Sequence, residues 1–186
     1  HPNSSAAVIA ALSPQKDLFQ NVSLAGRLHE IHFDHGNNIY TPEMAETAKR
    51  IYSKPNSDLP LFNSKIAGKT YNELTDPIEK AAWLRLFDEA HMDRSYPLIT
   101  PEGYGGSPVL TKSGNQQKVA WGSTPEIAKG IRAIQANGEL EKISPLLGEK
   151  HKVRNFYNNL IEPHKPHDIT ADTPAVAAAF LRPLSR

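Results

Sequence analysis

The chain has 186 residues, of which 39% are hydrophobic and 22% charged, and this length and composition fit one domain with a packed core. It has no cysteine, which excludes disulfide bonds, thiolate zinc sites, iron–sulfur clusters and cysteine nucleophiles. With 21 Lys and Arg against 20 Asp and Glu, the whole chain lacks the basic excess typical of nucleic-acid-binding proteins. No run of apolar residues approaches the ~18 that a membrane-spanning helix needs.

The first part of the chain predicts a series of short helices. One is expected over 4–12 and a second over 17–31, where apolar residues recur at helical spacing. Residues 32–40 predict a polar loop. The residues 41–43, Thr-Pro-Glu, supply a cap, a proline and an acidic residue for the start of a third helix, which ends near Ser53.

The middle of the chain predicts one helix and the only sheet element. Residues 76–79, Asp-Pro-Ile-Glu, open a helix by the same device, and its apolar positions place Trp83 in the core. The segments 108–111 and 118–121 flank Ser-Gly-Asn at 113–115, a pattern that predicts a β-hairpin.

The last third of the chain predicts further short helices. Residues 124–126, Thr-Pro-Glu, open a helix in which Ile127, Ile131 and Ile134 share one face, and Asn-Gly at 137–138 closes it. The remaining expected elements are helices over 140–147 and 150–160, a loop rich in Pro and His over 163–167, and a last helix capped by Asp172. The predicted fold class is therefore mainly α, with a β-hairpin insertion.

Two predicted helix starts near the C-terminus carry the strongest chemical pattern. A glycine turn over 147–154 opens one helix, and Asp172, 20 residues after Lys152, opens the next. Backbone N–H groups at such a turn suit a DNA phosphate, and a lysine there suits a phosphate contact or, if desolvated, an amine nucleophile. Residues 129–186 carry 9 Lys and Arg against 6 Asp and Glu, which agrees with an anionic partner.

These segments resemble the helix-hairpin-helix DNA glycosylase family, the endonuclease III-like proteins. The family carries a hairpin of the type L-P-G-V-G-x-K and then V-D-T-H. This chain has L-L-G-E-K-H-K over 146–152 and A-D-T-P over 171–174. The family's upstream helix ends in L-S-x-Q, and this chain has L-S-P-Q over 12–15, with Asn21 further on. The elements occur in the family's order.

The resemblance implies a role for each matched residue. Lys152 matches the lysine that attacks the sugar, and Asp172 matches the carboxylate that supports cleavage of the glycosidic bond. The implied mechanism is base flipping, departure of the base through an oxocarbenium-like state, and a Schiff base between Lys152 and C1′. The DNA-binding residues expected from the same motifs are Gln15, Gly148, Lys150, His151 and Arg154.

The resemblance also implies an organisation and a partner. A single domain, 1–186, is expected, with glycosylase-like ends over 1–40 and 124–186 and an insertion over approximately 54–123. The expected partner is double-stranded DNA, with no cofactor, no metal ion and no membrane. The expected location is the cytoplasm of a bacterial host or a virion.

A catalytically inactive descendant is the alternative. Lys150 stands where the family has its second hairpin glycine, and Pro174 stands where it has histidine. Such a protein would be structural or DNA-packaging and phage-derived, with a homo-oligomer or virion assembly partners. The first residue, His1, suggests a processed N-terminus, which favours this alternative slightly. Asp172 is equally well explained as a helix cap, worth about 1 kcal/mol, and Lys152 as a solvated helix residue.

Two further patterns leave alternatives open. His29 and His32 lie one helical turn apart and would share a metal ion with Asp34 or His35, or else form a polar helix end. Trp121, beside the predicted hairpin, either stacks on bases or packs on the sheet face.

Overall fold

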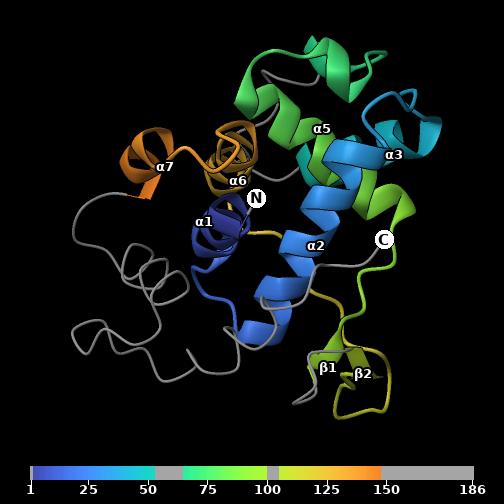
Figure 1. Cartoon of the computed structure of the whole chain (residues 1–186). Coiled ribbons are helices and arrows are strands. Elements are labelled where there is room, and N and C mark those ends of the chain that lie inside the picture. Colours follow the sequence, from blue (N-terminus) through green and yellow to red (C-terminus); the bar gives the residue numbers. More distant parts are fainter. Residues whose placement is uncertain (1, 53–64, 100–104, 148–186) are drawn as a thin grey trace, which may run out of the picture.

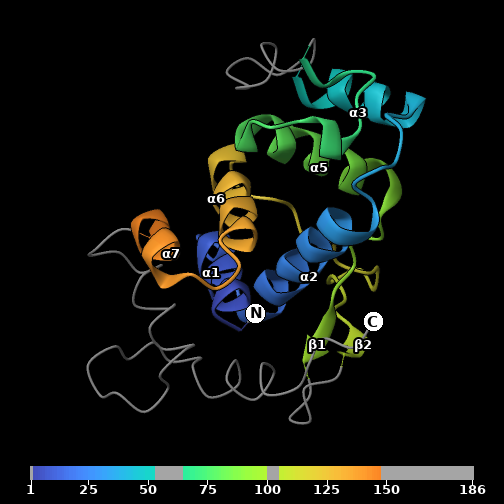
Figure 2. The same cartoon turned by 45° about the horizontal axis from the view of Figure 1, so that its top comes forward.

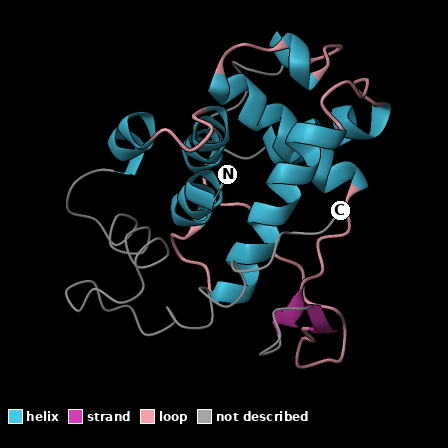
Figure 3. Cartoon of the chain, in the orientation of Figure 1, coloured by secondary structure: helices cyan, strands magenta, loops and turns pink. Residues whose placement is uncertain are grey.

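The structure, a computed structural model, describes residues 2–52, 65–99 and 105–147 (Figure 1). This part of the chain is mainly helical, as predicted, with a pair of short strands at one end (Figure 3). Its elements are α1 (Pro2–Leu12), α2 (Leu18–Asp34), α3 (Pro42–Tyr52), the 3-10 helix η1 (Tyr71–Glu73), α5 (Pro77–His91), β1 (Pro97–Ile99), β2 (Gly105–Pro108), α6 (Thr124–Gln135) and α7 (Leu140–Leu147).

Short polar side chains begin α2, α5 and α6 close to the positions that the sequence predicts, whereas α1 begins at Pro2, two residues before its expected start. Asp17 caps α2, where its Oδ1 accepts the Gln20 N–H at 2.8 Å while the Gln20 side chain accepts the Asp17 N–H at 3.2 Å. Asp76 caps α5 and accepts the Ile78 N–H at 2.9 Å. Ser123, one residue before the predicted start, caps α6. Each cap satisfies a backbone donor that has no partner inside its helix.

Helix α1 is enclosed by its neighbours. Every residue from Ala6 to Leu12 is at most 4% exposed. The helix packs against α2, α6 and α7, and Figure 2 shows α6 and α7 beside it. A helix that is apolar all round belongs in the interior. Because much of this one is alanine, its neighbours α2, α6 and α7 can approach closely.

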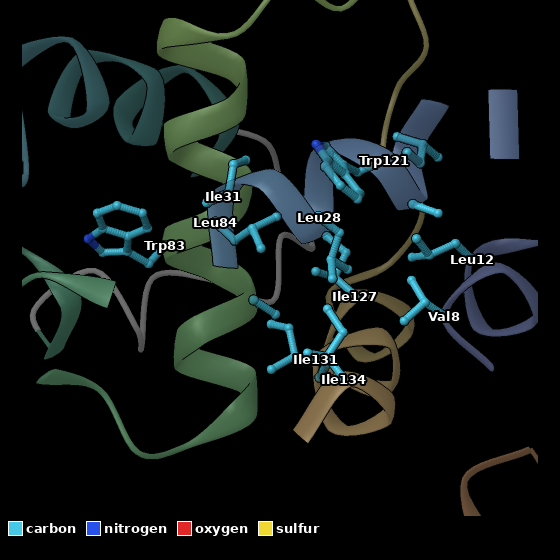
Figure 4. Packing of buried hydrophobic residues seen from close by; sticks show 14 of the residues in the cluster. Val8, Leu12, Leu28, Ile31, Trp83, Leu84, Trp121, Ile127, Ile131 and Ile134 are labelled. Atoms are coloured by element: carbon cyan, nitrogen blue, oxygen red, sulfur yellow. The ribbon is translucent and has the colours of Figure 1, made fainter. Parts of the chain in front are cut away.

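The core lies where α1, α2, α5 and α6 meet (Figure 4). The predicted face of α6, with Ile127 and Ile131, points toward Leu28 of α2 and Leu84 of α5. Gly130 lets α6 come close, since a Cβ atom there would lie 2.9 Å from Leu28 Cδ1. Helix α5, which falls within the predicted insertion, thus shares one core with α1 and α6.

Helix α5 is buried on more than one side. Leu84 faces the shared core, whereas Trp83 lies on the other side of the helix (Figure 4). The Trp83 Nε1 donates to the Lys69 carbonyl at 2.8 Å, and its ring packs against Tyr71 and Phe87. The prediction that Trp83 belongs to the core is confirmed.

The strands differ from those predicted. β1 and β2 pair antiparallel, and β2 ends at Pro108, the first residue of the predicted strand over 108–111. The rest of the predicted strands shows only isolated bridges, Leu110 with Gln116 and Ser95 with Lys118. The two legs share their hydrogen bonds with residues 94–96, because the Val109 N–H donates to the Tyr96 carbonyl and the Val119 N–H to the Arg94 carbonyl, both at 2.9 Å. The predicted turn is present, with Gly114 at φ 85°.

A buried ion pair joins α2 to α5. Arg27 Nε lies 2.8 Å from Asp88 Oδ1, and these side chains are 7% and 0% exposed. Trp121 Nε1 donates to Asp88 Oδ2 at 2.7 Å, and the Arg27 guanidinium lies 5.5 Å from the centre of the Trp121 ring. Burial raises the pKa of Asp88, while the positive charge of Arg27 opposes that rise. The network ties α2, α5 and the segment before α6 together.

We expect Asp88→Ala to lower the free energy of unfolding by about 3–5 kcal/mol, because it leaves the Arg27 charge buried without a partner. The double variant Arg27→Met/Asp88→Leu should lose less, since no lone charge remains in the interior. Urea denaturation measures both. Lys49→Ala, which breaks an exposed ion pair with Glu46, is the control and should change stability by less than about 1 kcal/mol. Equal losses for Asp88→Ala and Lys49→Ala would contradict the assignment.

Candidate nucleic-acid interface

Of the residues predicted to contact DNA, Gln15 lies in the part of the chain that the structure describes. The other predicted site residues lie outside that part: Gly148, Lys150, His151, Lys152, Arg154 and Asp172. The predicted helices over 150–160 and after Asp172 also lie outside the described residues. Within the described residues, the candidate interface is the turn that carries Gln15.

Gln15 lies in the turn that joins α1 to α2. Ser13 is buried and its Oγ donates to the Ala10 carbonyl at 2.8 Å, while the Lys16 N–H donates to the Ser13 carbonyl at 3.1 Å. Gln15 has φ 57°, in the left-handed region, and its side chain is exposed. A non-glycine residue there costs about 1–2 kcal/mol, so the surrounding turn must hold it in place. The result is an exposed amide on a fixed support.

The start of α2 is capped by its own side chains and is hydrogen-bonded to the segment that precedes β1. The side chains of Asp17 and Gln20 already bond the first backbone N–H groups, so this helix end has fewer free donors for an anion. Gln20 Nε2 also donates to the Tyr96 hydroxyl, which precedes β1, at 3.4 Å. Asn21 is 2% exposed, and its Oδ1 has no hydrogen-bond partner among the described residues.

The histidines at the end of α2 are engaged by protein groups. Helix α2 extends to Asp34, three residues beyond the predicted end, so His32 is helical rather than part of a loop. His29 Nδ1 lies 2.8 Å from the Ala25 carbonyl, and His32 Nδ1 lies 2.7 Å from the Tyr71 hydroxyl. Across residues 2–52, 65–99 and 105–147, no group of three His, Cys, Asp or Glu side chains is placed to hold a metal ion.

Lys80 forms a buried polar contact that the sequence analysis did not identify. It is 8% exposed, its Nζ donates to the Tyr71 carbonyl at 3.0 Å, and the same Nζ lies 4.0 Å from the centre of the Tyr71 ring. The signal in the sequence was a lysine one helical turn before the apolar residue Leu84. Burial lowers the pKa of Lys80. Burial also lowers the pKa of His32 to about 4, and the nearby positive charges of Lys80 and His29 act in the same direction.

Trp121 packs inside the protein and does not offer a base-stacking surface. It is 6% exposed, and its ring nitrogen is bonded to Asp88. Trp121 is buried as the packing alternative requires, but it packs against Asp88 of α5 and Arg27 of α2 rather than on the sheet face. The reason is the buried Asp88 carboxylate, which provides an acceptor for the indole N–H.

Comparison with protein-family models, with curated proteins and with solved structures finds no match to this chain. In the described part of the chain, every helix is too short or too polar to cross a membrane.

We expect the stability of the protein to fall as the pH falls from 6.5 toward 4, in part through His32. The folded-state pKa of about 4 lies below the ordinary value of 6.5, so in this range the unfolded chain binds a proton that the folded chain does not. Urea denaturation at pH 7 and pH 5 should show a loss about 1 kcal/mol larger for the wild type than for His32→Gln, allowing for solvent screening. Identical losses would show that His32 does not contribute.

Proposed function

We propose that this protein binds double-stranded DNA and acts as a base-excision or abasic-site enzyme of the glycosylase or lyase type, built on a helix-hairpin-helix glycosylase-like fold with a β-hairpin insertion. The observation that carries the proposal is the turn at Gln15. A glutamine that probes a DNA duplex has to project from a rigid support. Gln15 is exposed, and it follows the enclosed helix α1 and precedes the capped helix α2.

The proposed chemistry belongs to Lys152 and Asp172, whose roles rest on the resemblance. Base departure leaves positive charge on the sugar, and the Asp172 carboxylate would stabilise it. At an abasic site, the Lys152 amine adds to the C1′ aldehyde and water leaves, which gives a Schiff base. The protein needs no cofactor or metal ion for these steps. In this proposal the protein works in the cytoplasm of a bacterial host.

A structural or DNA-packaging protein without catalysis is the second candidate. Lys150 and Pro174 favour it, because both replace residues of the family's motifs. A protein of this kind would assemble with further copies of itself or with virion proteins. If borohydride traps no covalent adduct with abasic-site DNA while DNA binding is retained, the result favours this candidate or excision by Asp172 without a lyase step.

We expect borohydride to trap a covalent adduct between the protein and duplex DNA that carries an abasic site. Reduction of the Schiff-base C=N bond by borohydride makes the link permanent. Lys152→Ala should abolish the adduct, while Lys142→Ala, at a solvent-exposed lysine on α7, should leave it unchanged. Denaturing electrophoresis detects the adduct. A well-folded wild type that gives none has no lyase activity of this kind.

We expect Gln15→Ala to weaken binding of abasic-site duplex DNA about 3–10-fold, because it removes hydrogen bonds worth about 0.5–1.5 kcal/mol. Gln15→Gly should bind as weakly as Gln15→Ala but unfold at a temperature at least as high as the wild type, since glycine accepts the left-handed φ of 57° without strain. Fluorescence anisotropy and thermal unfolding separate the two effects. Gln135→Ala, at an exposed residue of α6, is the control. Unchanged affinity in both Gln15 variants would remove this residue from the interface.

A further inference from the structure

The segment 109–119, which we call the basic hairpin, projects a mainly polar and positive surface. Its exposed residues are Leu110, Lys112, Ser113, Gly114, Asn115, Gln116 and Lys118. It contains two lysines and no acidic residue. Leu110, at 57% exposure, is one of the few large apolar side chains on the described surface that are strongly exposed. Elsewhere on the described surface, Lys49, Lys65 and Lys142 pair with glutamates.

The turn of the basic hairpin is fixed by its own hydrogen bonds. The Thr111 N–H donates to the Asn115 carbonyl at 2.7 Å, and the Gly114 N–H donates to the Thr111 carbonyl at 3.0 Å. The Thr111 and Ser113 hydroxyls are 2.9 Å apart. The two lysines are therefore carried on an ordered support, and little conformational entropy of the backbone would be lost on binding.

The base of the basic hairpin is anchored beside the start of α2. The Tyr96 hydroxyl accepts from Gln20 of α2, and the Tyr96 carbonyl accepts from Val109 of the hairpin. The second leg ends at Val119, which is 1% exposed and whose carbonyl accepts from Arg27 Nη2 at 3.5 Å. Figures 1 and 2 both show the strands next to the end of α2 at which that helix begins. The base of the basic hairpin thus lies at the end of α2 that follows the turn at Gln15.

We propose that the basic hairpin is a second DNA-binding element, with Lys112 and Lys118 contacting backbone phosphates of the duplex beside the site probed by Gln15. The inference rests on the proposed function and adds a contact that the family resemblance does not include. Lysine ammonium groups bind phosphates as point charges, and a two-stranded ribbon is narrow enough to lie along a groove. The exposed Leu110 side chain fits against deoxyribose, which is the apolar part of the same backbone.

The acidic residues near the hairpin base are engaged. Asp93, whose pKa is lowered chiefly by hydrogen bonds from Ser95 and further by Lys118, accepts the Ser95 N–H at 2.9 Å. Glu89 lies within ion-pair distance of Arg85 and Arg94. The lysine of the turn itself, Lys112, lies away from these groups along the hairpin, and no ion pair with it is found among the described residues.

The test compares the salt dependence of binding. The double variant Lys112→Gln/Lys118→Gln should bind an abasic-site duplex more weakly than the wild type, and the slope of log K against log salt should fall by about 1.8, since each phosphate contact contributes about 0.9. Lys49→Gln/Lys65→Gln removes the same charge from lysines outside the hairpin and should keep the wild-type slope. Fluorescence anisotropy with a labelled duplex between 50 and 200 mM salt, about the range over which such slopes are defined, gives both values.

Leu110→Ser provides a second readout of the same surface. It should weaken binding while leaving the salt slope at the wild-type value, because it removes an apolar contact and no charge. All the substituted side chains are exposed, so thermal unfolding should be unchanged within experimental error. A variant that unfolds early is replaced by Lys112→Gln alone, whose expected change in slope is about 0.9.

The outcomes separate this inference from the proposed function. Wild-type protein that does not bind DNA overturns both. Wild-type protein that binds, with the hairpin variant unchanged in affinity and slope, overturns the role of the hairpin and leaves the proposed function in place. Equal losses in the hairpin variant and in Lys49→Gln/Lys65→Gln indicate a general charge effect and also overturn the inference. A loss confined to the hairpin variant supports it.

Discussion

The buried pair of Arg27 and Asp88 is the interaction on which the arrangement of the helices depends. A carboxylate with no solvent exposure is stable in the interior only when it is paired and hydrogen-bonded, and Asp88 has Arg27 on one oxygen and Trp121 on the other. These partners come from α2, from α5 and from the segment before α6. Loss of any one of these three side chains leaves a buried polar group without its partner. The network therefore fixes the relative positions of three elements that are far apart in the sequence. Arg27 also donates to the Val119 carbonyl, and this hydrogen bond anchors the second leg of the hairpin to α2.

Helix α2 connects the features with functional interest. Its start follows the turn at Gln15 and contacts Tyr96, its middle carries Arg27, and its end carries His32. A rigid helix anchored by a buried ion pair is suited to holding an exposed amide and a basic hairpin in one fixed relation. In the proposed function, that relation lets the protein contact a DNA lesion and the flanking phosphates at the same time, while the chemistry rests on Lys152 and Asp172.

The sequence predicted most helix starts and failed mainly at the strands. Caps followed by proline and an acidic residue marked α3, α5 and α6 to within a residue, because capping is a local interaction between near neighbours. The hairpin turn was also predicted, since glycine at 114 meets a local backbone requirement. The strands were misplaced because residues 94–96 also bond each leg, through Tyr96 with Val109 and Arg94 with Val119, and no local pattern reveals a distant partner.

The sequence by itself determined the mainly helical class, the caps of α3, α5 and α6, and the core face of α6. Each of these depends on residues within a few positions of one another, where spacing and side-chain chemistry are sufficient. Only the tertiary structure decided that Trp121 is bonded to Asp88, that Lys80 is buried against Tyr71, and that Gln20 of α2 contacts Tyr96 at the base of the basic hairpin. Burial and pairing of charged groups depend on which distant segments meet, and the energy of those contacts is set by packing rather than by local sequence.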